Sequence, residues 1–125
     1  MGDKVTKVLA ILASALLLLV GLRWIVDPAG AAAELGMPLL EGLGRSTQIG
    51  DLTAFFVVAG CFGLFGTLRR NSTALAAAAA LVGGAAVFRT LAWAAHDAAL
   101  APQILVEIVM LVVFLLARRH SAAAV

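Results

Sequence analysis

The sequence predicts an all-α integral membrane protein, a four-helix transmembrane bundle with both termini cytoplasmic. Hydrophobic residues make up 63% of the 125 residues and charged residues only 13%, whereas charged residues are roughly a quarter of a soluble domain. The apolar residues also gather in four long runs, and a membrane-spanning helix needs about 20 such residues. We therefore expect a single domain over residues 1–125, in a multi-pass protein of the inner (plasma) membrane.

The four predicted helices cover residues 8–26, 49–68, 73–96 and 101–117. The first has a second interpretation as a secretory signal peptide, because Lys4 and Lys7 precede the apolar stretch and small residues follow it. The run continues through Trp24 to spanning length, which favours an uncleaved helix.

An outer interfacial segment over residues 28–43 joins the first two helices. Its Asp-Pro start favours a short helix, since proline at the first helical position loses no needed hydrogen bond. Gly36 and Pro38 then end this helix. The segment is either a lid or a connecting loop with interfacial anchors.

Lysine and arginine are distributed unevenly along the chain. If the helices alternate in direction, one membrane side collects Lys4, Lys7, Arg69, Arg70, Arg118 and Arg119. Short cytoplasmic loops carry the excess of these residues, so this side and both termini should be cytoplasmic. Because the basic residues lie at helix ends rather than in one patch, we expect no nucleic-acid partner.

Small residues mark the expected packing faces. Gly60, Gly63 and Gly66 are spaced three apart, and alanines fill positions 76–80. Such residues let helix backbones approach closely where lipid supplies no hydrophobic driving force. The same faces also suit a homo-oligomer or a partner in a membrane complex.

Three polar stripes converge toward the outer side of the predicted bundle. Side chains three, four or seven apart share one helix face. The stripes are Arg45, Gln48 and Asp51 on the second helix, Arg89, Trp93 and His96 on the third, and Gln103 and Glu107 on the fourth. We take these eight residues as the candidate ligand-binding site, while Trp24 and Trp93 are also typical of interfacial aromatic anchors.

Arg89 and Glu107 are ionisable residues within apolar runs, which is rare and points to a functional site. At about 1.5 Å per residue, Glu107 lies roughly 16 Å above Arg118, near the middle of a roughly 30 Å hydrocarbon core. It must be paired, protonated or facing a wet cavity. Three interpretations stay open: a structural ion pair that sets helix register, a ligand site, or an ion or proton path.

Several chemistries lack their motifs. The sequence contains no Gly-rich phosphate loop, no HExxH, no nucleophile elbow and no CxxC. Cys61 is the single cysteine, so no multi-cysteine metal site is available. His96 with Asp97 lacks the further ligands that a metal site needs, and we expect no metal and no cofactor. A binding protein is favoured over an enzyme, although acid–base chemistry by Glu107 with Asp51 or His96 stays open.

The segments GGAAVFRTLAWAAHD (83–97) and LVEIVMLVVFLLARR (105–119) resemble a family of small bacterial four-helix membrane proteins described only as a domain of unknown function. DLTAFFVVAG (51–60) and the corner from Trp24 to Pro28 are similar to earlier segments of that family. The resemblance implies a four-helix fold and outer polar residues Arg89 and Glu107. It implies no activity.

These observations together predict a protein that binds a lipid-like or amphipathic small molecule in a polar pocket in the outer half of the bundle. Three alternatives stay open: an accessory or structural subunit of a membrane complex, a small proton-coupled multidrug exporter that uses Glu107, and a small lipid isomerase. The exporter would have to dimerise, with its carboxylate titrating alone.

Overall fold

The computed structural model describes residues 2–123, and all of its regular structure is helical. Its five helices are α1 (Asp3–Val26), α2 (Pro28–Glu34), α3 (Gly42–Leu68), α4 (Ser72–Ala95) and α5 (Gln103–Ala123). The predicted all-α class is therefore confirmed. α1, α3 and α4 are long and apolar enough to cross a membrane.

The fourth predicted span differs in kind from the other three. α5 has 21 residues and runs on past Arg118 and Arg119 to Ala123, beyond the predicted end at residue 117. Glu107 and this arginine pair shorten its uninterrupted apolar stretch, and α5 is not among the three helices that meet the length and composition of a span. The number of membrane crossings therefore stays a prediction.

The α2 corner follows from local chemistry. Asp27 accepts a hydrogen bond from the Gly30 backbone N–H at 3.2 Å, and Pro28 occupies the first turn. This side-chain cap satisfies one of the donors that a helix start leaves free. At the other end Gly36 has φ +76° and Met37 N–H donates to the Ala32 carbonyl at 2.9 Å, which is the Schellman arrangement that favours glycine.

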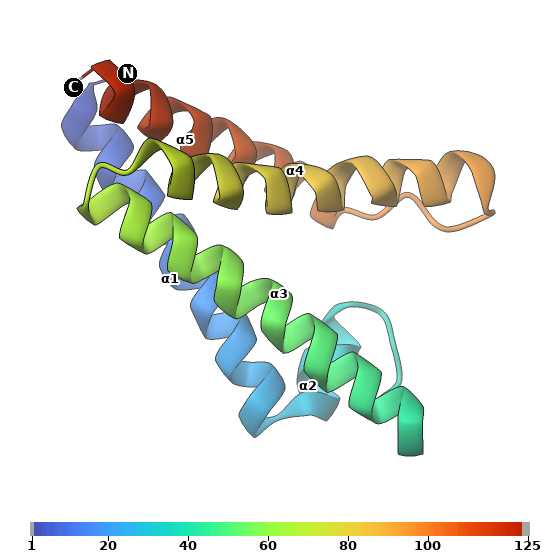
Figure 1. Cartoon of the computed structure of the whole chain (residues 1–125). Coiled ribbons are helices and arrows are strands. Elements are labelled where there is room, and N and C mark those ends of the chain that lie inside the picture. Colours follow the sequence, from blue (N-terminus) through green and yellow to red (C-terminus); the bar gives the residue numbers. More distant parts are fainter. Residues whose placement is uncertain (1, 124–125) are drawn as a thin grey trace.

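The helices form two pairs that meet at one end and diverge toward the other (Figure 1). α1 packs along α3 with α2 folded beside them, and α4 packs along α5. We call these pairs the α1/α3 arm and the α4/α5 arm, and the end where they meet the vertex. Figure 1 also places the N- and C-terminal ends of the chain together at the vertex.

Close backbone approach explains why the arms meet where they do. A Cβ added at Gly66 would lie 2.9 Å from the Leu75 backbone nitrogen of α4, and one at Gly63 would lie 2.8 Å from the Phe114 ring of α5. Neither position has room for a side chain. The glycines predicted as packing residues therefore serve contacts within this chain, around a core that includes fully buried Leu75 and Phe114.

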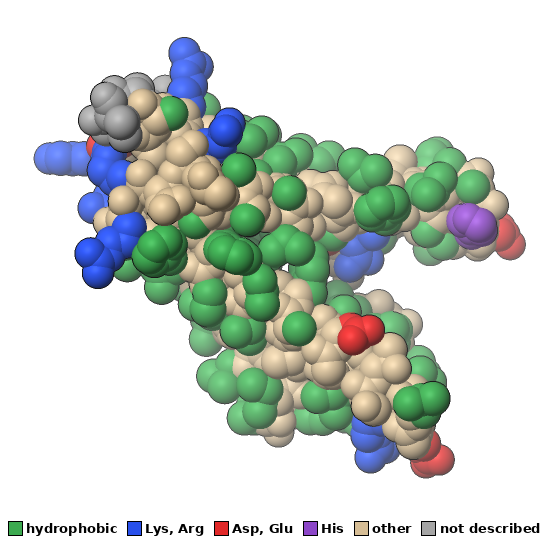
Figure 2. All heavy atoms as spheres, viewed as in Figure 1, with side chains coloured by type: hydrophobic (Ala, Val, Ile, Leu, Met, Phe, Trp, Pro, Cys, Tyr) green, Lys and Arg blue, Asp and Glu red, His purple; other side chains and the backbone are tan. Residues whose placement is uncertain are grey.

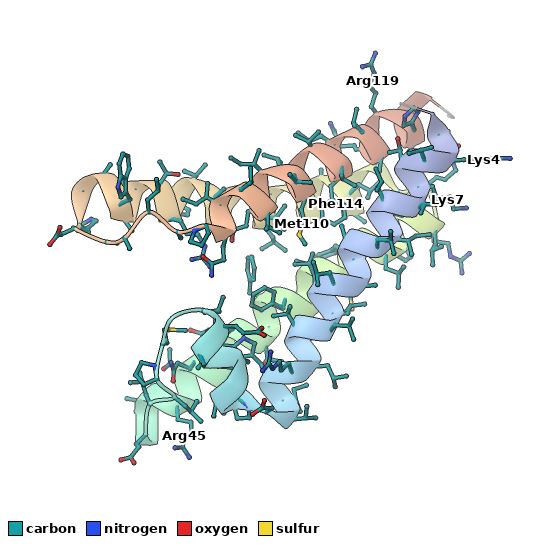
Figure 3. All side chains as sticks on the ribbon, turned by 180° about the vertical axis from the view of Figure 1, so that it is seen from behind. Lys4, Lys7, Arg45, Met110, Phe114 and Arg119 are labelled. Atoms are coloured by element: carbon teal, nitrogen blue, oxygen red, sulfur yellow. The ribbon has the colours of Figure 1, made fainter. Side chains whose placement is uncertain are left out.

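Polar contacts close the vertex. Arg70 lies 3.4 Å from the Asp3 carboxylate and donates a 2.9 Å hydrogen bond to the His120 carbonyl. This residue thus connects the start of α1, the α3–α4 turn and the end of α5. Lys4, Lys7 and Arg119 project outward around the same end (Figure 3).

A second, smaller core lies toward the far end of the α1/α3 arm. Trp24, Ala31 and Ala32 are buried there, where α2 folds against the end of α1. Trp24 has no exposed surface, so it is a core residue of this arm rather than an interfacial anchor. The Asp-Pro corner is responsible, because it turns α2 back over the indole ring.

Candidate functional site

A pocket of about 210 Å³ lies in the angle between the two arms. Figure 2 shows the hollow between the arms and the hydrophobic side chains along both of them. All five helices contribute to its wall: Leu16, Leu17, Val20, Ala31, Glu34, Leu35, Phe55, Phe56, Val82, Arg89, Gln103, Val106, Glu107 and Met110.

Polarity changes along the depth of this pocket. Toward the vertex, three helices each contribute a buried apolar residue to the wall: Leu17 of α1, Val82 of α4 and Met110 of α5. One to two turns farther from the vertex, α4 presents Arg89, and α5 presents Glu107 and Gln103. The pocket therefore has an apolar floor and a polar mouth. Figure 3 shows Met110 near the inner angle, with Phe114 beyond it toward the vertex.

The mouth contains the ion pair that the sequence pointed to. Arg89 Nε lies 3.1 Å from Glu107 Oε2, and the side chains keep 31% and 13% of their exposure. α4 and α5 run antiparallel along one arm, which brings the outward half of α4 beside the start of α5. The carboxylate is thus nearly enclosed while the guanidinium still reaches the opening.

At the mouth, one polar link joins the two arms. The Gln103 amide donates to the Glu34 carbonyl at 3.4 Å, from the start of α5 to the end of α2. The Glu34 carboxylate in turn pairs with Arg23 of α1, which also lies 3.6 Å from Asp27. The mouth is therefore lined by the Arg89–Glu107 ion pair, the Gln103 amide and Glu34, whose carboxylate pairs with Arg23 outside the pocket wall.

The structure brings together three of the eight candidate residues: Arg89, Glu107 and Gln103 line the pocket. Asp51, Trp93 and His96 are exposed and lie outside its wall. On α4, Trp93 and His96 lie apart from Arg89 because the end of this helix far from the vertex extends beyond the start of α5, where no helix covers it (Figure 1).

Gln48 and Arg45 have a local role instead. Gln48 is buried, accepts from the Leu40 backbone N–H at 2.8 Å and donates to the Pro38 carbonyl at 3.1 Å. Arg45 Nε donates to the Leu40 carbonyl at 2.8 Å. These bonds fasten the loop after α2 onto α3, which begins at Gly42 rather than near residue 49. Figure 3 shows Arg45 at the far tip of the arm.

Sequence reasoning missed Arg23, Glu34 and the adjacent rings of Phe55 and Phe56 as site residues. A signal existed for the first two. The Asp-Pro corner reverses the chain between α1 and α2, so a basic residue before it and an acidic residue after it are placed to pair. The phenylalanines carry no such signal, because apolar residues on a spanning helix face lipid, core or pocket equally well.

Among residues 2–123, no group of three or more His, Cys, Asp or Glu side chains is placed to hold a metal ion. Comparison with protein-family models, with curated proteins and with solved structures gives no match. The resemblance to a bacterial family therefore stays a prediction, and the site is interpreted from its own geometry.

The ion pair makes a prediction about stability. Arg89→Ala should destabilise more than Glu107→Gln, because it leaves an enclosed carboxylate without its partner whereas the amide stays neutral and still hydrogen-bonds. The double variant should lose less stability than the sum of the losses in the two single variants. We expect a coupling of about 1–2 kcal/mol, below that of a fully buried pair because Arg89 is nearly one-third exposed.

The measurement is a double-mutant cycle on thermal or denaturant unfolding in detergent. The control cycle pairs Glu107→Gln with Arg45→Ala at the tip of the other arm, which should be additive. Strict additivity in the Arg89 cycle would show that the pair does not interact.

Proposed function

We propose that the protein is an integral membrane protein that binds one lipid-like amphipathic molecule between its two arms. The observation that carries the proposal is the graded pocket, with the apolar floor at Leu17, Val82 and Met110 and the charged mouth at Arg89 and Glu107. Binding sites for small molecules are mostly apolar clefts with a few convergent polar groups. An amphipathic ligand would place its chain toward the vertex and its head group at the mouth.

The proposed membrane placement uses all four long helices as spans. Large apolar side chains face outward along them, including Leu12 and Leu19 of α1 at 59% and 63% exposure and Val109 of α5 at 55%. Lipid would cover these faces. The vertex carries six of the nine lysines and arginines and both chain ends, which supports a cytoplasmic vertex and an opening toward the outer leaflet of a bacterial inner membrane.

The source of affinity follows from this placement. A ligand that leaves the bilayer loses one hydrocarbon environment and gains another, so its chain supplies little net driving force. Polar contacts at the mouth contribute more, since hydrogen bonds and ion pairs are stronger where water is scarce. Selection therefore rests on the head group, while the apolar floor contacts only the part of the chain nearest the head group and the rest of the chain lies outside the pocket.

Two alternative functions receive less support. The exporter requires a carboxylate that titrates alone, whereas Glu107 is paired with Arg89. The accessory-subunit interpretation drew on glycine and alanine faces free for a partner. However, Gly60, Gly63 and Gly66 lie against Leu18, Phe114 and Leu75 of this chain, and Ala78 and Ala79 are buried within it. A pocket that binds one ligand is compatible with both the ion pair and the glycine contacts.

A pocket-filling substitution tests the proposal. Val106 and Val109 are both half-exposed on α5, at 49% and 55%, but only Val106 lines the pocket. A dioleoyl phosphatidylethanolamine and phosphatidylglycerol mixture should raise the melting temperature of the detergent-solubilised wild type and of Val109→Trp. Val106→Trp should lose this increment, because the indole occupies the space for the ligand.

The increment should grow with the logarithm of lipid concentration and correspond to roughly 2.7 kcal/mol at a hundredfold excess over the dissociation constant. Both tryptophan variants should match in ligand-free melting temperature, which controls for damage to the fold. Equal stabilisation of both variants by lipid, or no stabilisation of the wild type beyond that from added detergent, would contradict the pocket.

Orientation is tested separately. In a Cys61→Ser background, a single cysteine at Ser72 near the vertex should be shielded from an impermeant thiol reagent in intact cells, while one at Glu34 at the mouth should react. The reason is the excess of lysine and arginine at the vertex. Labelling of Ser72→Cys together with protection of Glu34→Cys would reverse the proposed orientation.

A further inference from the structure

The ion pair at the mouth leaves polar atoms without partners. Glu107 Oε1 is buried and receives no hydrogen bond from residues 2–123, although Oε2 is paired with Arg89. Arg89 uses Nε for that contact, and its two terminal nitrogens donate to none of the residues that the structure describes. Because both residues line the pocket, one carboxylate acceptor and several guanidinium donors remain for a ligand.

These atoms have specific requirements. A buried acceptor without a donor carries an unrecovered desolvation cost, and a charge-assisted hydrogen bond to it is stronger than a neutral one. An ammonium group with N–H bonds meets that need. The planar guanidinium suits a phosphate, whose oxygens accept from its paired N–H groups. The Arg89–Glu107 pair is therefore suited to one ligand that carries both an N–H cation and an oxyanion.

The charge balance of the mouth agrees. The charged groups there are two cations, Arg23 and Arg89, and three carboxylates, Asp27, Glu34 and Glu107, so the mouth carries one excess negative charge. A ligand of no net charge adds none to this low-dielectric site. An anionic head group would bring an additional negative charge beside Glu107 without a new cation to compensate it.

Building on the proposed amphiphile pocket, we propose that its ligand is a zwitterionic phospholipid with a primary ammonium, that is, a phosphoethanolamine head group. Its ammonium donates to Glu107 Oε1 and its phosphate accepts from the terminal nitrogens of Arg89. A phosphocholine head group has the same net charge but no N–H donor. It leaves Oε1 unpaired, so the carboxylate discriminates between the two.

Methylation of the head group provides the test. Dioleoyl phosphatidylethanolamine, its N-methyl and N,N-dimethyl derivatives, and dioleoyl phosphatidylcholine share chains, phosphate and net charge but lose one N–H at each step. Native mass spectrometry of the detergent-solubilised full chain, titrated with each lipid, gives the apparent dissociation constants. We expect the last step to weaken binding about tenfold or more, as for loss of one charge-assisted hydrogen bond. Dioleoyl phosphatidylglycerol should also bind more weakly than phosphatidylethanolamine.

Variants assign the discrimination to one carboxyl group. Glu107→Gln should reduce the ratio between phosphatidylcholine and phosphatidylethanolamine dissociation constants toward one. Asp51→Asn removes a carboxylate that is exposed outside the pocket and should keep the ratio. If Glu107→Gln fails to fold, Arg89→Lys provides the second variant: it keeps the charge but loses the planar donors, and should weaken all four lipids together.

The outcomes separate this inference from the proposed function. Equal affinity for all five lipids, with binding abolished by Val106→Trp, would overturn the head-group inference and leave the amphiphile pocket standing. An unchanged ratio in Glu107→Gln would also overturn it. Binding of none of the lipids would overturn both.

Discussion

Contact between the two helix pairs is closest where their facing residues are small, and this packing constraint determines where the pocket lies. At the vertex, Gly63 admits the Phe114 ring and Gly66 admits the α4 backbone at Leu75. Toward the other end the facing residues include Phe56, Arg89 and Glu107, which are too large for the same approach. Helices that pack closely at one end and meet bulky residues at the other must diverge.

Because the arms diverge, the charged residues lie at the opening of a pocket, whereas a parallel bundle would enclose them between helices. Fully enclosed between helices, an arginine–glutamate pair is most simply a structural element. Here the pair lies at the mouth of the pocket, and Arg89 retains 31% of its exposure. Arg23 and Glu34 extend the polar surface onto the other arm through the Gln103 link. The same charges therefore stabilise the mouth and remain accessible to a ligand between the arms.

Sequence patterns predicted the features that depend on local chemistry. Apolar runs indicated α1, α3 and α4, the Asp27-Pro28 corner indicated α2, and helical spacing singled out Arg89, Gln103 and Glu107. They did not predict the angle between the arms, because spacing shows which residues share a face but not how far that face stays covered. Gln48 shares a stripe with Asp51, yet it bonds a loop whose path depends on Gly36 and Gly42 at positive φ.

The most direct test of a lipid between the arms is photocrosslinking with a phosphatidylethanolamine whose acyl chain carries a diazirine, followed by mass-spectrometric mapping. Leu17 and Met110 are 3% and 7% exposed and line the pocket, whereas Leu19 is 63% exposed on the outer face of α1. An occupied pocket predicts crosslinks at Leu17 and Met110 that saturate at one lipid per chain and disappear with excess unlabelled lipid. Crosslinks confined to outward residues such as Leu19, rising without saturation, would show that lipid surrounds the protein but does not enter between its arms.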